Sequence, residues 1–265
     1  MTPSFMILFA WFAFAGTHLW MSASGLRERL APHYGHMGFT LIYLIVTVLS
    51  LSILIASLAL YGDQGLAGFQ LTTPFLLWSL RIGSAVGAFL VVTGLIGYPK
   101  SPIAILARRI GTSQNNNPLR PPTGIARITR HPFFVGLALI SLCHIFLASS
   151  LAIATFFVGL FVISALGIPL QDRKLRNRWA AVYARYEQQS STLPFGSLHK
   201  QTDKPTTKDW ISWIICLLVA IALFGVFHPL WTHANGAGFV ILILIYGTLG
   251  TVIGIVKGLK ARRLD

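Results

Sequence analysis

Three histidines lie within or at the edge of long apolar stretches, where an imidazole can bind a metal or move a proton. They are His18, His131 and His144. Neutral imidazole is the commonest metal ligand in proteins, and two imidazoles at one level are what a haem iron needs on its two axial sides. The alternative is that each ring is a polar group bonded to a backbone carbonyl or a neighbouring helix. Spacing alone favours this second interpretation.

His131 belongs to the stretch RITRHPFFVG at 127–136, where basic residues stand directly against an apolar run. Pro132 suits the first turn of a helix, because the N–H that proline lacks would have no partner there. Arg127 and Arg130 fit the headgroup region of a membrane. The stretch therefore holds His131 at a rigid helix start, where it could meet a ligand with apolar and anionic parts.

The elements that position these histidines are predicted to be membrane-spanning helices. The chain has 265 residues, of which 54% are hydrophobic and only 11% are charged. Soluble domains have about a quarter of their residues charged. The apolar residues form blocks long enough to cross roughly 30 Å of hydrocarbon. We predict an all-α membrane protein, a polytopic helical bundle that forms one transmembrane domain over 1–265.

Seven apolar blocks are candidate spans. They lie at 4–22, 39–60, 74–97, 133–149, 151–170, 210–228 and 237–256. The fourth and fifth blocks are predicted to form a tight helical hairpin, and the count falls to six or five if this hairpin is re-entrant. Two long segments, 98–130 and 171–209, are expected on the cytoplasmic side. The second should contain a short interfacial helix at 172–188, judged from its mixture of basic and aromatic residues.

The basic residues predict the orientation. With seven spans, 20 of the 21 lysines and arginines fall on alternate loops. By the positive-inside rule, the N-terminus lies outside and the C-terminus in the cytoplasm, as in a bacterial inner-membrane protein. Anionic lipids explain the formal net charge of +14, so no nucleic-acid partner is expected.

This orientation predicts the depth of each histidine. His18 lies about one turn from the cytoplasmic end of the first span, and His131 starts the fourth span at the same face. His131 and His144 are thirteen residues apart, or about 20 Å along a helix, so they cannot share one metal unless the helix breaks. His18 and His131 could face each other across a bundle. A zinc site is less expected, because no third ligand is near.

Arg81 is the one basic residue inside a predicted span, seven positions into the third block. An arginine at this depth must face the bundle interior, water or a partner. It either extends back to the outer interface or serves as an internal counter-charge for an acidic ligand group such as a haem propionate. The sequence leaves both interpretations open.

The pattern GIARITRHP at 124–132, followed by Gly136 and His144, resembles the NnrU family, which includes the plant zeta-carotene isomerases. The NnrU-like region covers about 4–235. The chain has Gly35-His36 where the family often has Gly-Glu. Further similarities are GTHL at 16–19, LRERL at 26–30, DRK at 172–174 and STLPF at 191–195.

The resemblance implies a b-type haem (haem b) held by histidines. Zeta-carotene isomerases use such a haem in a redox-gated isomerisation, whereas bacterial NnrU proteins are associated with nitric-oxide reduction in denitrification. Carried over by motif, His18 and His131 are the expected iron ligands, and His144 is a second candidate. Arg130, beside His131, is a candidate contact of the cofactor, and Arg81 is another under its counter-charge interpretation. A shared scaffold does not fix a substrate, so only a small or lipophilic molecule is expected.

A rival resemblance starts from the same histidine. RHPFFVG at 130–136 is similar to the RHPxYxG motif of membrane methyltransferases that modify isoprenylcysteine or phospholipids and bind S-adenosylmethionine. WAAVYARY at 179–186 resembles their tyrosine-bearing segment. Gln171-Asp172 stands where those enzymes usually have paired glutamates, and Phe134 replaces the usual tyrosine. A methyltransferase of this kind is therefore the alternative function.

A third class is a non-catalytic protein that supports the assembly or activation of a membrane oxidoreductase. The cytoplasmic segments 98–130 and 171–209 are long enough to dock such a partner. Histidines inside the spans argue mildly against this class.

Overall fold

The computed structural model describes residues 2–23, 25–97, 122, 124–197, 206–207, 210–211, 213–218 and 220–222. Four helices in this part are long and apolar enough to cross a membrane, namely Thr2–Ser22, Gly38–Tyr61, Pro74–Leu95 and Leu151–Asn177. Shorter apolar helices lie at Pro132–Leu147 and Trp213–Ala222. The predicted all-α membrane protein is confirmed. The span expected at 237–256 and most of segment 98–130 lie outside the described residues.

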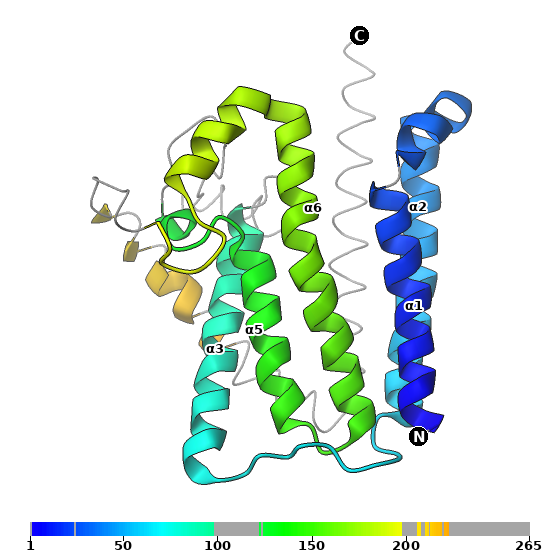
Figure 1. Ribbon diagram of the computed structural model, residues 1–265, viewed down its shortest axis with the longest axis vertical. Coiled ribbons are helices and arrows are strands. Elements are labelled where there is room, and N and C mark those ends of the chain that lie inside the picture. Colours follow the sequence, from blue (N-terminus) through cyan, green and yellow to red (C-terminus); the bar gives the residue numbers. More distant parts are fainter. Residues whose placement is uncertain are drawn as a thin grey trace. The chain divides into compact units, whose positions relative to one another are not determined.

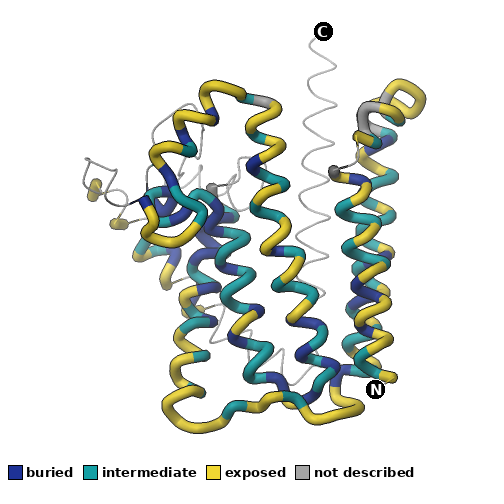
Figure 2. Tube along the Cα trace, viewed as in Figure 1, coloured by how far each residue is buried: buried dark blue, intermediate teal, exposed yellow. Residues whose placement is uncertain are grey.

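Large apolar side chains are exposed along the helices. Figure 2 marks the exposed residues of each helix in yellow. In the first helix, Phe9 is 75% exposed and Phe12 is 70% exposed. Soluble proteins rarely carry contiguous apolar surface of this kind. Lipid tails are the solvent that such a surface fits, which agrees with an integral membrane protein.

The chain divides into two compact units. The first takes its described residues from Met1–Thr73 and His144–Gly159, and the second takes them from Pro74–Cys143 and Leu160–Val226. The prediction of a single transmembrane domain stays a prediction.

In the first unit, α1 (Thr2–Ala23) and α2 (Leu26–Tyr61) pack against each other. Gly25 joins them with a φ of 68°, a left-handed conformation that glycine adopts without strain. We expected this second helix to start at 39, but helical structure begins at Leu26 and is interrupted at Gly35, where φ is 72°. The membrane-spanning part of α2 therefore begins after the Gly35 kink.

The connection after α2 is tied to the turn of the helical hairpin in the same unit. Gly68 N–H donates to Ser149 O at 3.0 Å, and Leu71 N–H donates to Phe146 O at 3.0 Å. Ser150 caps the following helix, because its Oγ accepts from Ile153 N–H at 3.0 Å. The predicted turn of the hairpin is thus an ordered, hydrogen-bonded structure.

In the second unit, α3 (Pro74–Gly97) runs beside α5 (Pro132–Leu147), whose residues up to Cys143 belong to this unit (Figure 1). Glycines permit their close approach. A Cβ added at Gly136 would lie 2.5 Å from Gly87 O, so no side chain fits there. A Cβ at Gly167 would lie 2.3 Å from the ring of Phe134, so this aromatic side chain of α5 packs directly on the backbone of α6.

The last described long helix, α6 (Leu151–Gln189), continues well beyond the predicted span at 151–170. Its helical geometry breaks at Ala180, where φ is 37° and ψ is −115°. The predicted interfacial helix at 172–188 is therefore a continuation of α6, redirected at Ala180. This redirection brings the last turns of α6 back toward the start of α5 (Figure 1).

Candidate functional site

The segment that carries Arg130 and His131 is held in place before α5 begins. It follows η1, a short 3-10 helix at Gly124–Arg127 whose first three residues are buried. Thr129 is fully buried, and its hydroxyl donates to Thr192 O at 2.7 Å while it accepts from His131 N–H at 3.3 Å. The backbone that carries Arg130 and His131 is therefore held in place by these hydrogen bonds.

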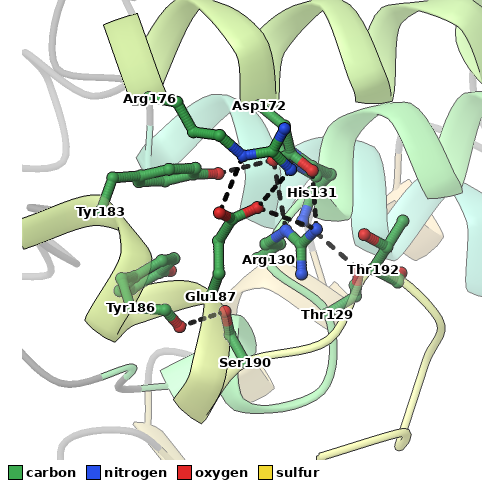
Figure 3. A network of polar contacts seen from close by, with 10 residues as sticks. All are labelled: Thr129, Arg130, His131, Asp172, Arg176, Tyr183, Tyr186, Glu187, Ser190 and Thr192. Atoms are coloured by element: carbon green, nitrogen blue, oxygen red, sulfur yellow. Dashed lines mark hydrogen bonds and ion pairs between the residues drawn. The ribbon is translucent and has the colours of Figure 1, made fainter. Parts of the chain in front are cut away.

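Asp172, on α6, accepts hydrogen bonds from three side chains (Figure 3). His131 Nε2 lies 2.5 Å from Asp172 Oδ1, and Tyr183 donates its hydroxyl to the same oxygen at 2.5 Å. Arg130 donates from Nε to Oδ1 at 3.2 Å and from Nη2 to Oδ2 at 2.6 Å. The Asp172 cluster, as we call Arg130, His131, Asp172 and Tyr183, therefore joins three segments of the chain through one carboxylate.

The cluster is shielded from solvent at its centre and open at its rim. The side chains of His131 and Asp172 are 4% and 6% exposed, and that of Arg130 is 13% exposed. Glu187 lies at this rim, with Oε1 at 3.6 Å from Arg130 Nη2 and both carboxylate oxygens bonded to Arg176 at 2.8 and 2.9 Å. Burying charges costs several kcal/mol per ion unless each is paired with good geometry. The forked contact of Arg130 supplies such a pairing.

The two tyrosines in the part of α6 beyond the candidate span stay protonated. Burial raises the pKa of Tyr183 far above its ordinary value, and the hydrogen bond to Asp172 raises it further. Burial likewise raises the pKa of Tyr186 to about 12. The rings of the two residues stack with their centroids 5.9 Å apart. Tyr183 therefore acts as a hydroxyl donor to Asp172 at any physiological pH.

The contact with Asp172 decides the tautomer of His131. An ionised carboxylate only accepts hydrogen bonds, so the hydrogen must lie on Nε2. Among the described residues, Nδ1 has no hydrogen-bond partner. In the neutral ring this atom carries the lone pair, which could ligate a metal or accept a proton.

His18 is held differently, inside α1 of the first unit. Tyr43 Oη lies 3.0 Å from Nδ1 and 3.2 Å from Nε2 of the imidazole, and a single hydroxyl can bond only one of them well at a time. Phe14 stacks on the ring at a centroid distance of 5.5 Å. The ring of His18 therefore has one hydroxyl and aromatic surroundings, with no charged partner among the described residues.

The other two candidates have their own surroundings. His144 is in the last turn of α5, in the first unit, with its ring centroid 4.7 Å from that of Phe157. Arg81 is exposed on α3, with Cζ 5.4 Å from the centroid of the Trp78 ring, a cation–π contact. Of the five predicted site residues, the structure brings Arg130 and His131 together. No group of three or more histidine, cysteine or acidic side chains suited to a metal occurs among the described residues.

Three residues of this site were not singled out from the sequence as partners of His131, namely Asp172, Tyr183 and Glu187. Asp172 and Glu187 are two of only seven acidic residues in the chain. Asp172 ends a long apolar run, where an acidic residue needs a partner to be buried. The scarcity of acidic residues could have identified Asp172 and Glu187, and its position at the end of an apolar run is a second signal for Asp172.

The comparisons with known proteins agree with this architecture. The family model described as NnrU protein matches residues 6–235. No curated protein and no solved structure matches the chain. Since the family model covers most of the sequence, including most of α1 and the whole Asp172 cluster, the chain belongs to the NnrU protein family.

Proposed function

We propose that this protein binds a b-type haem in the membrane and carries out redox or isomerase-like chemistry on a small or lipophilic substrate. The observation that carries the proposal is the buried contact between His131 and Asp172. Histidines that bind metals almost always donate their other N–H to a carboxylate, a carbonyl or water. The His131–Asp172 pair has this arrangement in the protein itself.

The residues fit a haem in their chemistry. His131 offers Nδ1 as the ligand atom, because Asp172 takes the hydrogen on Nε2. His18 offers a second imidazole inside a span, and His144 is the alternative to it. Arg130, whose Nε and Nη2 are engaged by Asp172, lies beside His131, where its remaining N–H groups suit an anionic propionate. Arg81 is the corresponding candidate on α3.

The haem iron would supply one-electron redox chemistry at this site. The protein's own residues determine its surroundings. Asp172 fixes the ring orientation of His131 and makes the imidazole a stronger donor. Arg130 and Tyr183 keep the carboxylate in place by occupying its remaining acceptor positions.

The distribution of basic residues supports an inner-membrane location with the Asp172 cluster on the cytoplasmic side. Arg127, Arg130, Arg173, Lys174 and Arg176 all lie near this end of α5 and α6. Such basic residues attract anionic lipids. Labelling single cysteines placed at 174 and at 66 in intact cells tests this orientation, since only position 66 should react with an impermeant reagent.

The haem proposal is tested by the absorption spectrum and pyridine haemochrome of detergent-purified protein from haem-sufficient cells. We expect stoichiometric haem in the wild type, and loss of haem in His131→Ala and in His18→Ala. If His144 replaces His18 as the ligand, His144→Ala loses haem and His18→Ala keeps it. His33→Ala is the matched control, because His33 is an exposed histidine. Monodisperse, colourless wild-type protein would refute the proposal.

A methyltransferase is the second candidate, and one observation favours it. The histidine of the RHP motif, Asp172 and the tyrosine-bearing segment, which the methyltransferase resemblance groups by sequence, do meet in one cluster. Calorimetric titration with S-adenosylmethionine tests this candidate. Micromolar binding that is lost in Asp172→Asn and retained in Asp63→Asn would favour it over haem binding.

A further inference from the structure

Two apolar side chains are exposed on the short loop that follows α6. Leu193 is 73% exposed and Phe195 is 60% exposed, and we call this pair the apolar tip. The residues that flank the loop are buried, with Ser190 at 4% and Ser197 at 1% exposure. The tip is therefore a local projection and not the end of a loose segment.

Hydrogen bonds fix the loop on the segment that precedes α5. Phe195 N–H donates to Ile128 O at 2.9 Å, and Arg130 N–H donates to Ser191 O at 2.8 Å. The buried hydroxyl of Thr129 adds a third bond, to Thr192 O. The apolar tip consequently keeps a constant position relative to the start of α5.

Phe195 also adopts a backbone conformation that aromatic residues avoid. Its φ is 65°, in the left-handed region where bulky residues are outliers. Glycine or asparagine would occupy this position with less strain. Strained residues persist where the surrounding structure fixes them and often where their side chain has a use. Since 60% of Phe195 is exposed, most of this strained apolar residue lies outside the packing of the described protein.

The position of the tip indicates its surroundings. The segment 128–130 immediately precedes Pro132, where the apolar helix α5 begins. Arg173, Lys174 and Arg176 are exposed on α6 at the same end of the hairpin, next to Asp172. Apolar side chains close to basic residues are typical of segments that lie in the membrane interface. All these residues belong to the second unit.

We propose that Leu193 and Phe195 insert into the bilayer leaflet at the start of α5 and hold the redirected end of α6 against the membrane surface. The lipid interface is the partner of this surface. Its acyl chains receive the two apolar side chains, and its anionic headgroups contact the neighbouring basic residues. The inserted tip keeps Tyr183 and Glu187 over Asp172, because the loop directly continues the helix that carries them.

The test places a fluorescent label at the tip in bilayers. Phe195→Cys is made in a background of Cys143→Ala and Cys216→Ala, and is labelled with an environment-sensitive fluorophore. The protein is reconstituted in vesicles of equal parts phosphatidylcholine and phosphatidylglycerol that carry a quencher on the acyl chain. Leu193→Cys is labelled in parallel, so that the result does not depend on one variant.

Two further labelled positions serve as references for a label in lipid and a label in water. Phe9→Cys reports a lipid-facing position, because Phe9 is 75% exposed within a span. Gln188→Cys reports an exposed polar position on the cytoplasmic part of α6. We expect labels at 193 and 195 to be quenched by the acyl-chain quencher to at least half the extent seen at 9, and to be shielded from aqueous iodide. If the labels at both tip positions are quenched by iodide and not by the acyl-chain quencher, as the label at 188 is, the proposal is overturned. The tip would then be a binding surface for a protein partner.

Discussion

Two histidines of this protein are held by opposite means. His131 is bonded to a buried carboxylate that also binds an arginine and a tyrosine. His18 has one tyrosine hydroxyl within reach and is otherwise surrounded by aromatic rings. The first arrangement uses paired charges at the end of the helices, whereas the second uses a neutral contact inside two spans.

The difference shows how polar groups are accommodated at different depths. At the membrane boundary, charged side chains can be buried because several partners are available to neutralise each other. Inside the span, a single hydroxyl satisfies an imidazole without introducing a charge. We therefore expect substitutions in the Asp172 cluster to have larger effects than substitutions beside His18.

The largest loss of stability against unfolding is expected for Asp172→Asn. This change removes the forked ionic contact of Arg130 and leaves it only the longer contact with Glu187, and breaking a buried pair costs about 3–5 kcal/mol. Unfolding of the detergent-solubilised protein by a denaturing detergent measures the loss. Asp63→Asn is the control, because Asp63 is exposed. Equal stability of the two variants would show that the cluster does not stabilise the fold.

Tyr183→Phe should have the second largest effect. It removes one hydrogen bond to a carboxylate, worth roughly 1.5–3 kcal/mol, and leaves the other partners of Asp172 in place. Tyr186→Phe is matched to it, since Tyr186 is also buried and its hydroxyl has no hydrogen-bond partner among the described residues. The same unfolding assay compares the two, and a larger loss in Tyr186→Phe would contradict the assigned bonding.

A smaller effect is expected for Tyr43→Phe beside His18. Hydrogen bonds between membrane helices average about 0.6 kcal/mol, because the unfolded state in the membrane finds other partners. Tyr61→Phe, in the last turn of the same helix, serves as the control. If Tyr43→Phe destabilises the protein as much as Tyr183→Phe does, the proposed contrast between the two regions is wrong.

The sequence predicted the helices better than it predicted the contacts between them. Blocks of apolar residues located α1, α3, α5 and α6, because the thickness of the bilayer imposes a minimum length on each. The kinks at Gly35 and Ala180 were missed. A kink changes the backbone direction without interrupting the local composition, so the hydrophobic pattern does not show it.

The meeting of His131 and Asp172 depends on tertiary structure. His131 lies 18 residues before Ser149 in the hairpin turn, and Asp172 lies 23 residues after it. An antiparallel hairpin brings positions at equal distances from the turn together, so the sequence could place the two within about two helical turns of each other. It could not show that the aspartate turns toward the histidine, because that orientation depends on how α6 rotates against Phe134 at Gly167.

The smallest effect is expected for Arg176→Gln at the rim of the cluster. Arg176 makes two hydrogen bonds to Glu187, but its side chain is 56% exposed. Exposed ion pairs gain little, because solvent and salt screen the charges while two long side chains lose freedom. Unfolding measured at low and at high salt should show no resolvable difference between Arg176→Gln and the wild type at high salt. A loss as large as that of Tyr183→Phe, unchanged by salt, would mean that the rim is as dry as the centre of the cluster and that Glu187 belongs to the buried network.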